Sequence, residues 1–195
     1  MYSSKENVNI LTALLVKEGI TKAIVCPGSR NSPIVHNLCA CPDITCYPVT
    51  DERSAGFVAL GMTLADNDPV AVCVTSGSAL LNIAPAAAEA YYQNRPLIII
   101  SADRPVQWID QQDGQTIHQQ NALSPNVRKS VTLPEPHDDE ERWYCNRLVN
   151  EALNASTIDG GGPVHINVAI GEPLFDYRVL QLPDERRTIL HRAVT

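Results

Sequence analysis

Four short polar segments each follow an apolar run, and they contain side chains that can bind ligands or exchange protons. The segments are Pro27-Gly28-Ser29-Arg30, Asp51-Glu52-Arg53, Ser76-Gly77-Ser78 and Asp103-Arg104. In open α/β folds, ligands bind at the carboxyl ends of strands. Glu52 follows such a run where a helix begins, so its carboxyl group could hold one ligand atom with a defined arrangement of protons. The arginines suit carboxylate ligands, which arginine binds through two parallel hydrogen bonds.

Each of these features also has a simpler structural explanation. An acid in the first turn of a helix, as at Glu52, stabilises the helix dipole by only ~0.3–1 kcal/mol. Arg30 and Arg104 could be solvent-facing arginines at strand ends. Ser76-Gly77-Ser78 suits an anion-binding nest at a helix N-terminus, and it suits a tight strand-to-helix turn equally well. The residues alone leave these alternatives open.

Hydrophobic periodicity predicts strands and helices that alternate along the chain. The predicted helices cover residues 4–18, 32–38, 54–65, 78–92 and 138–156, and the predicted strands cover 23–26, 44–49, 70–75, 97–100, 129–133 and 163–169. Two of the strand segments are continuously apolar, as is typical of parallel strands covered on both faces. The alternation predicts an α/β fold: a doubly wound, about six-stranded parallel sheet with helices on both faces.

Capping residues and prolines predict where several helices begin, end or break. Ser4 is a predicted N-cap, and Gly19 is a predicted stop for the first helix. Ser32 is a second predicted N-cap, with Pro33 at the first helical position. Pro85 predicts a kink or break within the helix at 78–92.

The periodicity fades over residues 102–126, which form a long, polar, glutamine-rich segment. Long loops in compact domains are often functional, and we expect residues 106–125 to be mobile. After Gly171 the chain becomes irregular and charged. These features predict a domain over residues 1–180, with 181–195 as the start of a linker to a further domain.

Composition restricts the classes of function. The 195 residues suit one domain, and 44% of them are hydrophobic, which is enough to build a core. The net charge of −7 argues against a nucleic-acid or anionic-membrane surface. No apolar run approaches the ~20 residues of a membrane span, and the N-terminus lacks a signal-peptide core. We therefore expect a cytoplasmic location.

Cysteine and glycine patterns argue against several cofactor sites. In the cytoplasm the six cysteines would be reduced thiols. Cys39-x-Cys41-x4-Cys46 fits no common zinc spacing, so small apolar packing residues are the favoured interpretation. The cluster Gly160-Gly161-Gly162 precedes a strand, which excludes a dinucleotide fingerprint, and no Walker phosphate loop occurs.

Four extended segments together resemble one family of enzymes. They are Cys26-Pro27-Gly28-Ser29-Arg30-Asn31-Ser32-Pro33, Asp51-Glu52-Arg53-Ser54-Ala55-Gly56, Val74-Thr75-Ser76-Gly77-Ser78-Ala79 and Ser101-Ala102-Asp103-Arg104-Pro105. This set is similar to the 2-succinyl-5-enolpyruvyl-6-hydroxy-3-cyclohexene-1-carboxylate synthases, thiamine diphosphate-dependent enzymes of the menaquinone pathway. The resemblance covers about residues 5–177. The glutamate-bearing segment alone indicates only the wider thiamine-enzyme superfamily.

The resemblance implies a three-domain enzyme of which this chain is the first, pyrimidine-binding domain, with the thiamine diphosphate-binding fold. Mg²⁺ or Mn²⁺ would be held by a Gly-Asp-Gly…Asn motif on the last domain, which this chain lacks, so no metal ligands are expected here. The superfamily binds its cofactor between the first domain of one subunit and the last domain of its partner. A homo-oligomer, either a dimer or a tetramer, is therefore expected.

The resemblance also implies roles for individual residues. Glu52 matches the glutamate that hydrogen-bonds N1′ of the cofactor's aminopyrimidine and favours its reactive tautomer, and apolar neighbours such as Phe57 would bury it. This makes Glu52 the catalytic and cofactor-binding candidate.

Four further residues match those that hold the acceptor substrate, the dicarboxylate isochorismate: Ser29, Arg30, Arg104 and Gln115. Gly114 departs from the family pattern, which often has asparagine there, so a side-chain donor is lost. His118, in the same loop, is interpreted as a solvated loop residue.

The complete enzyme would be a transferase that decarboxylates 2-oxoglutarate and adds the succinyl-semialdehyde unit to isochorismate. The 195-residue chain alone is predicted to be inactive, because it would hold only half of the cofactor site. Two alternatives remain: a domain of another thiamine-dependent decarboxylase or acetolactate-synthase-like enzyme, and a non-catalytic binding or assembly domain.

Overall fold

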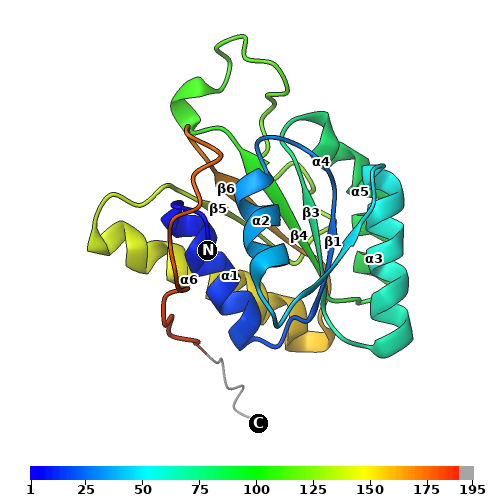
Figure 1. Ribbon diagram of the computed structural model, residues 1–195. Helices are drawn as coiled ribbons and strands as arrows, with labels where there is room; N and C mark the ends of the chain where they lie inside the picture. The colour runs from blue at the N-terminus through cyan, green and yellow to red at the C-terminus, as the bar shows by residue number, and fades with distance from the viewer. Residues whose placement is uncertain (189–195) are drawn as a thin grey trace.

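A parallel six-stranded sheet organises residues 1–188, the part of the chain that the computed structural model describes (Figure 1). The strand order is β2-β1-β3-β4-β6-β5 and every pairing is parallel. The strands are β1 (Lys22–Val25), β2 (Thr45–Pro48), β3 (Val70–Val74), β4 (Leu97–Asp103), β5 (Lys129–Leu133) and β6 (Val164–Ala169). The helices are α1 (Glu6–Lys17), α2 (Ser32–Ala40), α3 (Glu52–Asp66), α4 (Ser78–Asn82), α5 (Ala84–Tyr92) and α6 (Asp139–Thr157), with short 3₁₀ turns η1 (Val106–Trp108) and η2 (Ile158–Gly160). The predicted α/β fold class is confirmed.

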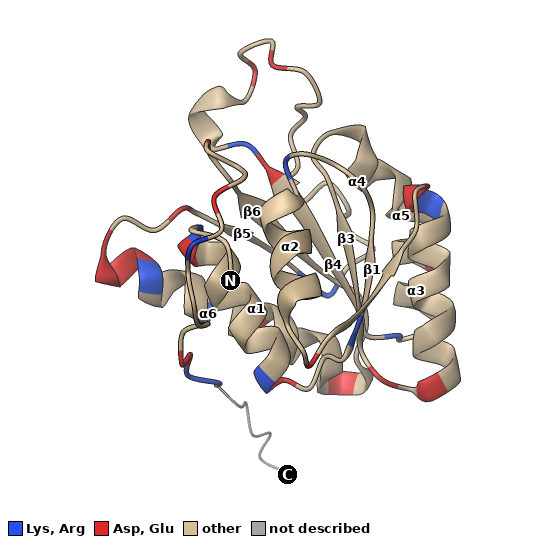
Figure 2. Ribbon diagram, viewed as in Figure 1, with Lys and Arg blue, Asp and Glu red and all other residues tan. Residues whose placement is uncertain are grey.

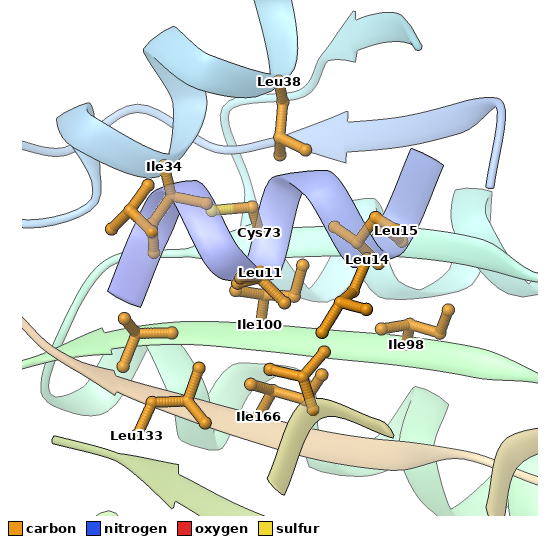
Figure 3. Close-up of a cluster of buried hydrophobic side chains, with 14 of the residues drawn as sticks. Leu11, Leu14, Leu15, Ile34, Leu38, Cys73, Ile98, Ile100, Leu133 and Ile166 are labelled. Atoms are coloured by element: carbon orange, nitrogen blue, oxygen red, sulfur yellow. The ribbon is translucent and has the colours of Figure 1, made fainter. Parts of the chain in front are cut away.

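Helices cover both faces of the sheet, because alternate strand residues point to opposite sides. In β3, Ala71 and Cys73 join a core cluster with α1, α2 and α6 (Figure 3). Val72 and Val74 join a second cluster with α3, α4 and α5. Burying a large apolar side chain stabilises a fold by ~1.5–3 kcal/mol, so β3 is held from both faces.

The first two helices begin differently from the prediction. Lys5, not Ser4, occupies the N-cap position of α1 and makes no side-chain cap, while the Ser3 hydroxyl accepts a hydrogen bond from the Lys5 N–H at 3.2 Å. In α2, Ser32 is already helical and Asn31 occupies the cap position. Serine at a helix start is therefore not always the capping residue. The stop at Gly19 is confirmed, since its φ of +76° is left-handed.

The break at Pro85 is confirmed. α4 ends at Asn82 and α5 begins at Ala84, so Ile83 is the shared junction. Pro85 falls in the first turn of α5, where its missing N–H leaves no intrahelical bond unmade. Ile83 is fully buried and fixes the junction in the second core cluster.

Two element boundaries differ from the prediction where the candidate site begins. α3 begins at Glu52 rather than Ser54, since the Asp51 carboxylate caps it by accepting a hydrogen bond from the Ser54 N–H at 2.7 Å. β4 continues past Ile100 to Asp103, because residues 101–103 pair with β6. The prediction ended the strand at Ile100, because the polar side chains that follow interrupt the apolar run.

Charged residues lie mainly on loops and helix ends, and the middle stretches of the strands carry none (Figure 2). The N-terminus is held by an antiparallel bridge between Tyr2 and Val179. Within residues 1–188, no helix has the length and hydropathy needed to cross a membrane. Residues 189–195 of the predicted linker lie outside the described part of the chain.

Candidate functional site at the carboxyl edge of the sheet

All four polar segments meet at one edge of the molecule, because parallel strands place their carboxyl ends together. The chain adds β2 on one side of β1 and then β3 on the other side, and such a reversal opens a crevice where ligands bind. At this reversal Gly28 lies against β3. A Cβ on Gly28 would stand 2.5 Å from the Cβ of Thr75, so only glycine permits this approach.

Glu52 occupies the first position of α3, directly after β2, and is half-buried. Within residues 1–188 its carboxylate has no hydrogen-bond or ion-pair partner. Burial raises the pKa of the Cys26 thiol to about 12, and the Glu52 carboxylate adds to that rise. The negative charge of Glu52 therefore acts electrostatically on Cys26, the residue that follows β1. Phe57, the apolar neighbour expected to help bury Glu52, is itself 45% exposed.

Arg30 reaches across the edge of the sheet towards the end of β6. Its side chain is only 14% exposed, so it does not simply face solvent. Its Nη1 donates to the Ile170 carbonyl at 2.9 Å and lies 3.3 Å from the Glu172 carboxylate. Ser29, by contrast, is exposed on the same loop.

Arg104 is the centre of a second group of contacts after β4. Its side chain is 15% exposed, and its Nε donates to Asp113 at 2.7 Å. Its Nη1 lies 3.5 Å from both the Ser76 hydroxyl and the Gln115 carbonyl. Arg104 thus joins the ends of β3 and β4 to the loop that carries Gln115.

Ser76-Gly77-Ser78 forms a tight turn rather than an open anion nest. The Gly77 N–H already donates to the Gln119 Oε1 at 2.7 Å, and α4 is only five residues long. Gly77 has a φ of +77°, and a Cβ there would stand 2.9 Å from the Gln115 backbone. The loop after β4 therefore packs directly on this glycine.

A buried polar network lies behind the loop, and the sequence analysis missed it. Gln119 donates through Nε2 to the Ala102 carbonyl at 3.0 Å and to the Asn167 Oδ1 at 2.7 Å. Asn167 in turn donates to the Asp103 carboxylate at 2.8 Å. Burial raises the pKa of Asp103, although the hydrogen bond from Asn167 opposes that rise.

The same network continues into the sheet. The Ser101 hydroxyl donates to the Asn167 Oδ1 at 2.7 Å and lies 2.8 Å from the His165 Nε2. Burial lowers the pKa of His165 to about 4, so the ring is neutral at neutral pH. A signal was present in the sequence: polar residues alternate with apolar ones in two strands that pair, at Ser101 and Asp103 and at His165 and Asn167.

A cavity at this edge has a volume of about 910 Å³ and lies outside the ends of β4, β6 and β5. Here too the order of strands reverses, since β6 inserts between β4 and β5. Asp103, Gln119, Asn167 and the loop residues 104–107, 109 and 110 contribute to its wall. Among the predicted site residues, only Arg104 lines it.

The structure therefore brings the predicted residues to one edge but not into one set of direct contacts. Arg104 and Gln115 are adjacent, whereas within residues 1–188 no hydrogen bond or ion pair joins Glu52 to Ser29 or Arg30. His118 is exposed, and its Nε2 lies 3.0 Å from the Asp110 carboxylate. In the same described residues, no three His, Cys, Asp or Glu side chains gather as a metal site.

Fold and sequence together define the class of protein. The profile of the thiamine pyrophosphate enzyme, N-terminal TPP binding domain, matches residues 6–123, which include every predicted site residue. The chain belongs to this family of thiamine pyrophosphate enzymes.

Curated relatives give the more particular likeness. The chain is 59% identical, over 95% of its length, to the 2-succinyl-5-enolpyruvyl-6-hydroxy-3-cyclohexene-1-carboxylate synthase of Bacteroides fragilis. It is 58% identical over 95% of its length to the synthase of Bacteroides thetaiotaomicron, and 45% identical over 89% to that of Porphyromonas gingivalis. It covers 34%, 34% and 30% of those proteins, so it spans about a third of the curated relatives it matches. The resemblance read from the four segments is confirmed.

Proposed function

We propose that this chain is the pyrimidine-binding domain of a 2-succinyl-5-enolpyruvyl-6-hydroxy-3-cyclohexene-1-carboxylate synthase. The whole protein would be a transferase of menaquinone biosynthesis that decarboxylates 2-oxoglutarate and adds the succinyl-semialdehyde unit to isochorismate. The identity of 59% over 95% of the chain supports the proposal, as does the convergence of the four segments at one sheet edge.

Thiamine diphosphate fits the residues at the first reversal of the sheet. A carboxyl group must be available to the ring nitrogen of the aminopyrimidine, and the Glu52 carboxylate has no other partner within residues 1–188. When bound, the cofactor would supply the carbon centre that stabilises a carbanion. Glu52 would hold the proton at the ring nitrogen and so select the tautomer of the ring.

Arg30 and Arg104 suit an acceptor with two carboxylates. Each guanidinium is mostly buried and already lies beside a carboxylate, Glu172 for Arg30 and Asp113 for Arg104. The Glu172 side chain is 70% exposed, and the Asp113 side chain is 46% exposed. Because both acids are largely exposed to solvent, water can solvate either of them when a substrate carboxylate takes its place beside the arginine.

The remaining acceptor contacts would come from Ser29 and Gln115. Ser29 is exposed on the loop after β1, and Gln115 is held over Gly77 by its backbone. A Cβ at Gly114 would meet no atom within 4 Å, so the backbone leaves room for a side chain to begin there. Glycine at position 114 would therefore lose the hydrogen-bond donor of an asparagine side chain.

The proposal extends to parts that this chain does not contain. Mg²⁺ or Mn²⁺ would be bound by the last domain of the full protein, and the active unit would be a homodimer or a homotetramer. A cytoplasmic location accords with the six free cysteines. Determining the sequence beyond Thr195 tests this extension, because a Gly-Asp-Gly…Asn motif is expected there.

The availability of the Glu52 carboxylate is the observation that carries the proposed chemistry. In the full-length protein, Glu52→Gln should lower turnover by roughly 10²-fold or more, as expected for loss of a positioned proton donor. The measurement is steady-state formation of product from 2-oxoglutarate and isochorismate.

Glu140→Gln is the matched control, because it makes the same change in the first turn of α6, on an exposed side chain. It should leave turnover unchanged. Full activity of the Glu52 variant would refute the catalytic role. An active parent enzyme that ignores isochorismate would instead favour an acetolactate-synthase-like reaction.

A further inference from the structure

One side of α6 carries three asparagines spaced four residues apart: Asn146, Asn150 and Asn154. In an α-helix this spacing places side chains on one face, one turn above the other. The chain segment 185–188 lies along this face and has no helix or strand of its own. Each of the three asparagines makes hydrogen bonds to that segment.

Most of these bonds reach the main chain of the segment rather than its side chains. The Arg186 carbonyl accepts from the Nδ2 of both Asn146 and Asn150, each at 3.1 Å. The Thr188 N–H donates to the Asn150 Oδ1 at 2.7 Å, and the Thr188 carbonyl accepts from Asn154 at 2.7 Å.

The repeat distances of the two partners match. Four residues of an α-helix rise about 6 Å, and two residues of extended chain advance about 6.6 Å. Arg186 and Thr188 are two residues apart, and each is bonded by two successive asparagines: Arg186 by Asn146 and Asn150, and Thr188 by Asn150 and Asn154. The contacts follow this order, from Asn146 at Arg186 to Asn154 at Thr188.

Glu185 fixes the register of the segment. It is 6% exposed, and its carboxylate accepts hydrogen bonds from the Arg142 Nη2 at 2.5 Å and from Asn146 at 2.7 Å. Arg142 also bonds Glu6 of α1. The segment is thus tied through α6 to the first helix of the domain.

We propose that the three asparagines form a docking surface on α6 for extended main chain, and that its occupant is residues 185–188 of this chain. Main-chain groups are the same for every residue except proline. The surface therefore accepts varied side chains at positions 186 and 188, whereas Glu185 is anchored on α6 and Arg187 pairs with Glu18 at the end of α1. The chain leaves the described domain at Thr188, beside the C-terminal half of α6.

The test uses the full 195-residue chain and amide hydrogen exchange at Thr188, measured by NMR. In the unmodified chain the Thr188 amide should be protected. Asn150→Ala removes its acceptor and should speed exchange there at least tenfold, while amides of β3 and β4 stay unchanged. Trypsin cleavage after Arg187 should accelerate by a similar factor.

Arg186→Ala is the control, because it removes a side chain and keeps the main-chain carbonyl. It should leave Thr188 protection unchanged. Because Asn150 is buried, Asn154→Ala serves as a second variant at a half-buried position, and it should accelerate cleavage after Arg187. An unprotected Thr188 amide in the unmodified chain would overturn the proposal. So would unchanged protection in Asn150→Ala, or equal loss of protection in Arg186→Ala.

Discussion

The candidate site residues differ in whether their charged groups already have hydrogen-bond or ion-pair partners within the protein. Arg30 and Arg104 each lie beside an acid and bond neighbouring loops. The Glu52 carboxylate has no such partner within the described chain. A carboxylate left unpaired at a strand end is open to a ligand, whereas the arginines must exchange one partner for another. The two kinds of residue are therefore expected to affect binding differently.

His165 gives a pH prediction at the scale of one residue. Its folded pKa of about 4 is below the unfolded value of 6.5, so the unfolded chain binds a proton between these values and the folded chain does not. The stability that depends on neutral His165 is complete above pH 6.5 and is lost as the pH falls towards 4. The loss at pH 4 should be on the order of 2–3 kcal/mol.

His165→Gln isolates this effect. The variant should be less stable at pH 7, because it disturbs the bonds to Ser101 and Ser130. Its free energy of unfolding should nevertheless fall less steeply between pH 6.5 and pH 4. Urea denaturation across this range provides the measurement, and identical slopes in both proteins would contradict the assignment.

At the scale of elements, the turn between β3 and α4 depends on Gly77. Its φ of +77° and ψ of −142° form a conformation that essentially only glycine adopts. Gly77→Ala would also place a Cβ 2.9 Å from the Gln115 backbone. We expect a loss of ~1–3 kcal/mol in the free energy of unfolding.

Gly114→Ala is the matched comparison in the loop that packs on this turn. A Cβ at Gly114 would meet no atom within 4 Å, so the free energy of unfolding of this variant should stay within about 0.5 kcal/mol of the parent value. Urea denaturation of both variants measures the difference. An equal loss of unfolding free energy in Gly77→Ala and Gly114→Ala would contradict the special requirement for glycine at position 77.

Most elements could be predicted from the sequence because their apolar periodicity is strong. β3 and the break at Pro85 are examples. The extension of β4 to Asp103 was not predicted, because its polar side chains Ser101 and Asp103 bond Asn167 of β6, which is distant in sequence. Periodicity describes neighbours along the chain, and these partners come from elsewhere.

The candidate site was predictable for a different reason. Its residues follow strands, and parallel strands must end at one edge, so their convergence followed from the fold class. The contacts of Arg30 with Ile170 and of Gly77 with Gln119 depend on how loops cross that edge. No local pattern specifies those crossings. The expectation that loop 106–125 moves stays a prediction, although Gln119 fixes one part of it.

For the whole molecule, the 195-residue chain should show no turnover of 2-oxoglutarate with isochorismate, even with thiamine diphosphate and Mg²⁺ supplied. It spans about a third of its curated relatives, and the proposed diphosphate and metal site would lie on another domain. The measurement is a product assay on the purified chain, with the full-length protein as the positive control. Measurable turnover by the chain would contradict the division of the site between domains.

The insertion of β6 between β4 and β5 has a consequence for synthesis on the ribosome. Once residues 1–123 have emerged, every predicted site residue has been made, but β5, α6 and β6 have not. Until β6 appears, β4 presents an open edge flanked by buried isoleucines such as Ile98 and Ile100. Unpaired apolar edges promote aggregation. The nascent chain is therefore prone to aggregate through the open edge of β4 until β6 has been translated.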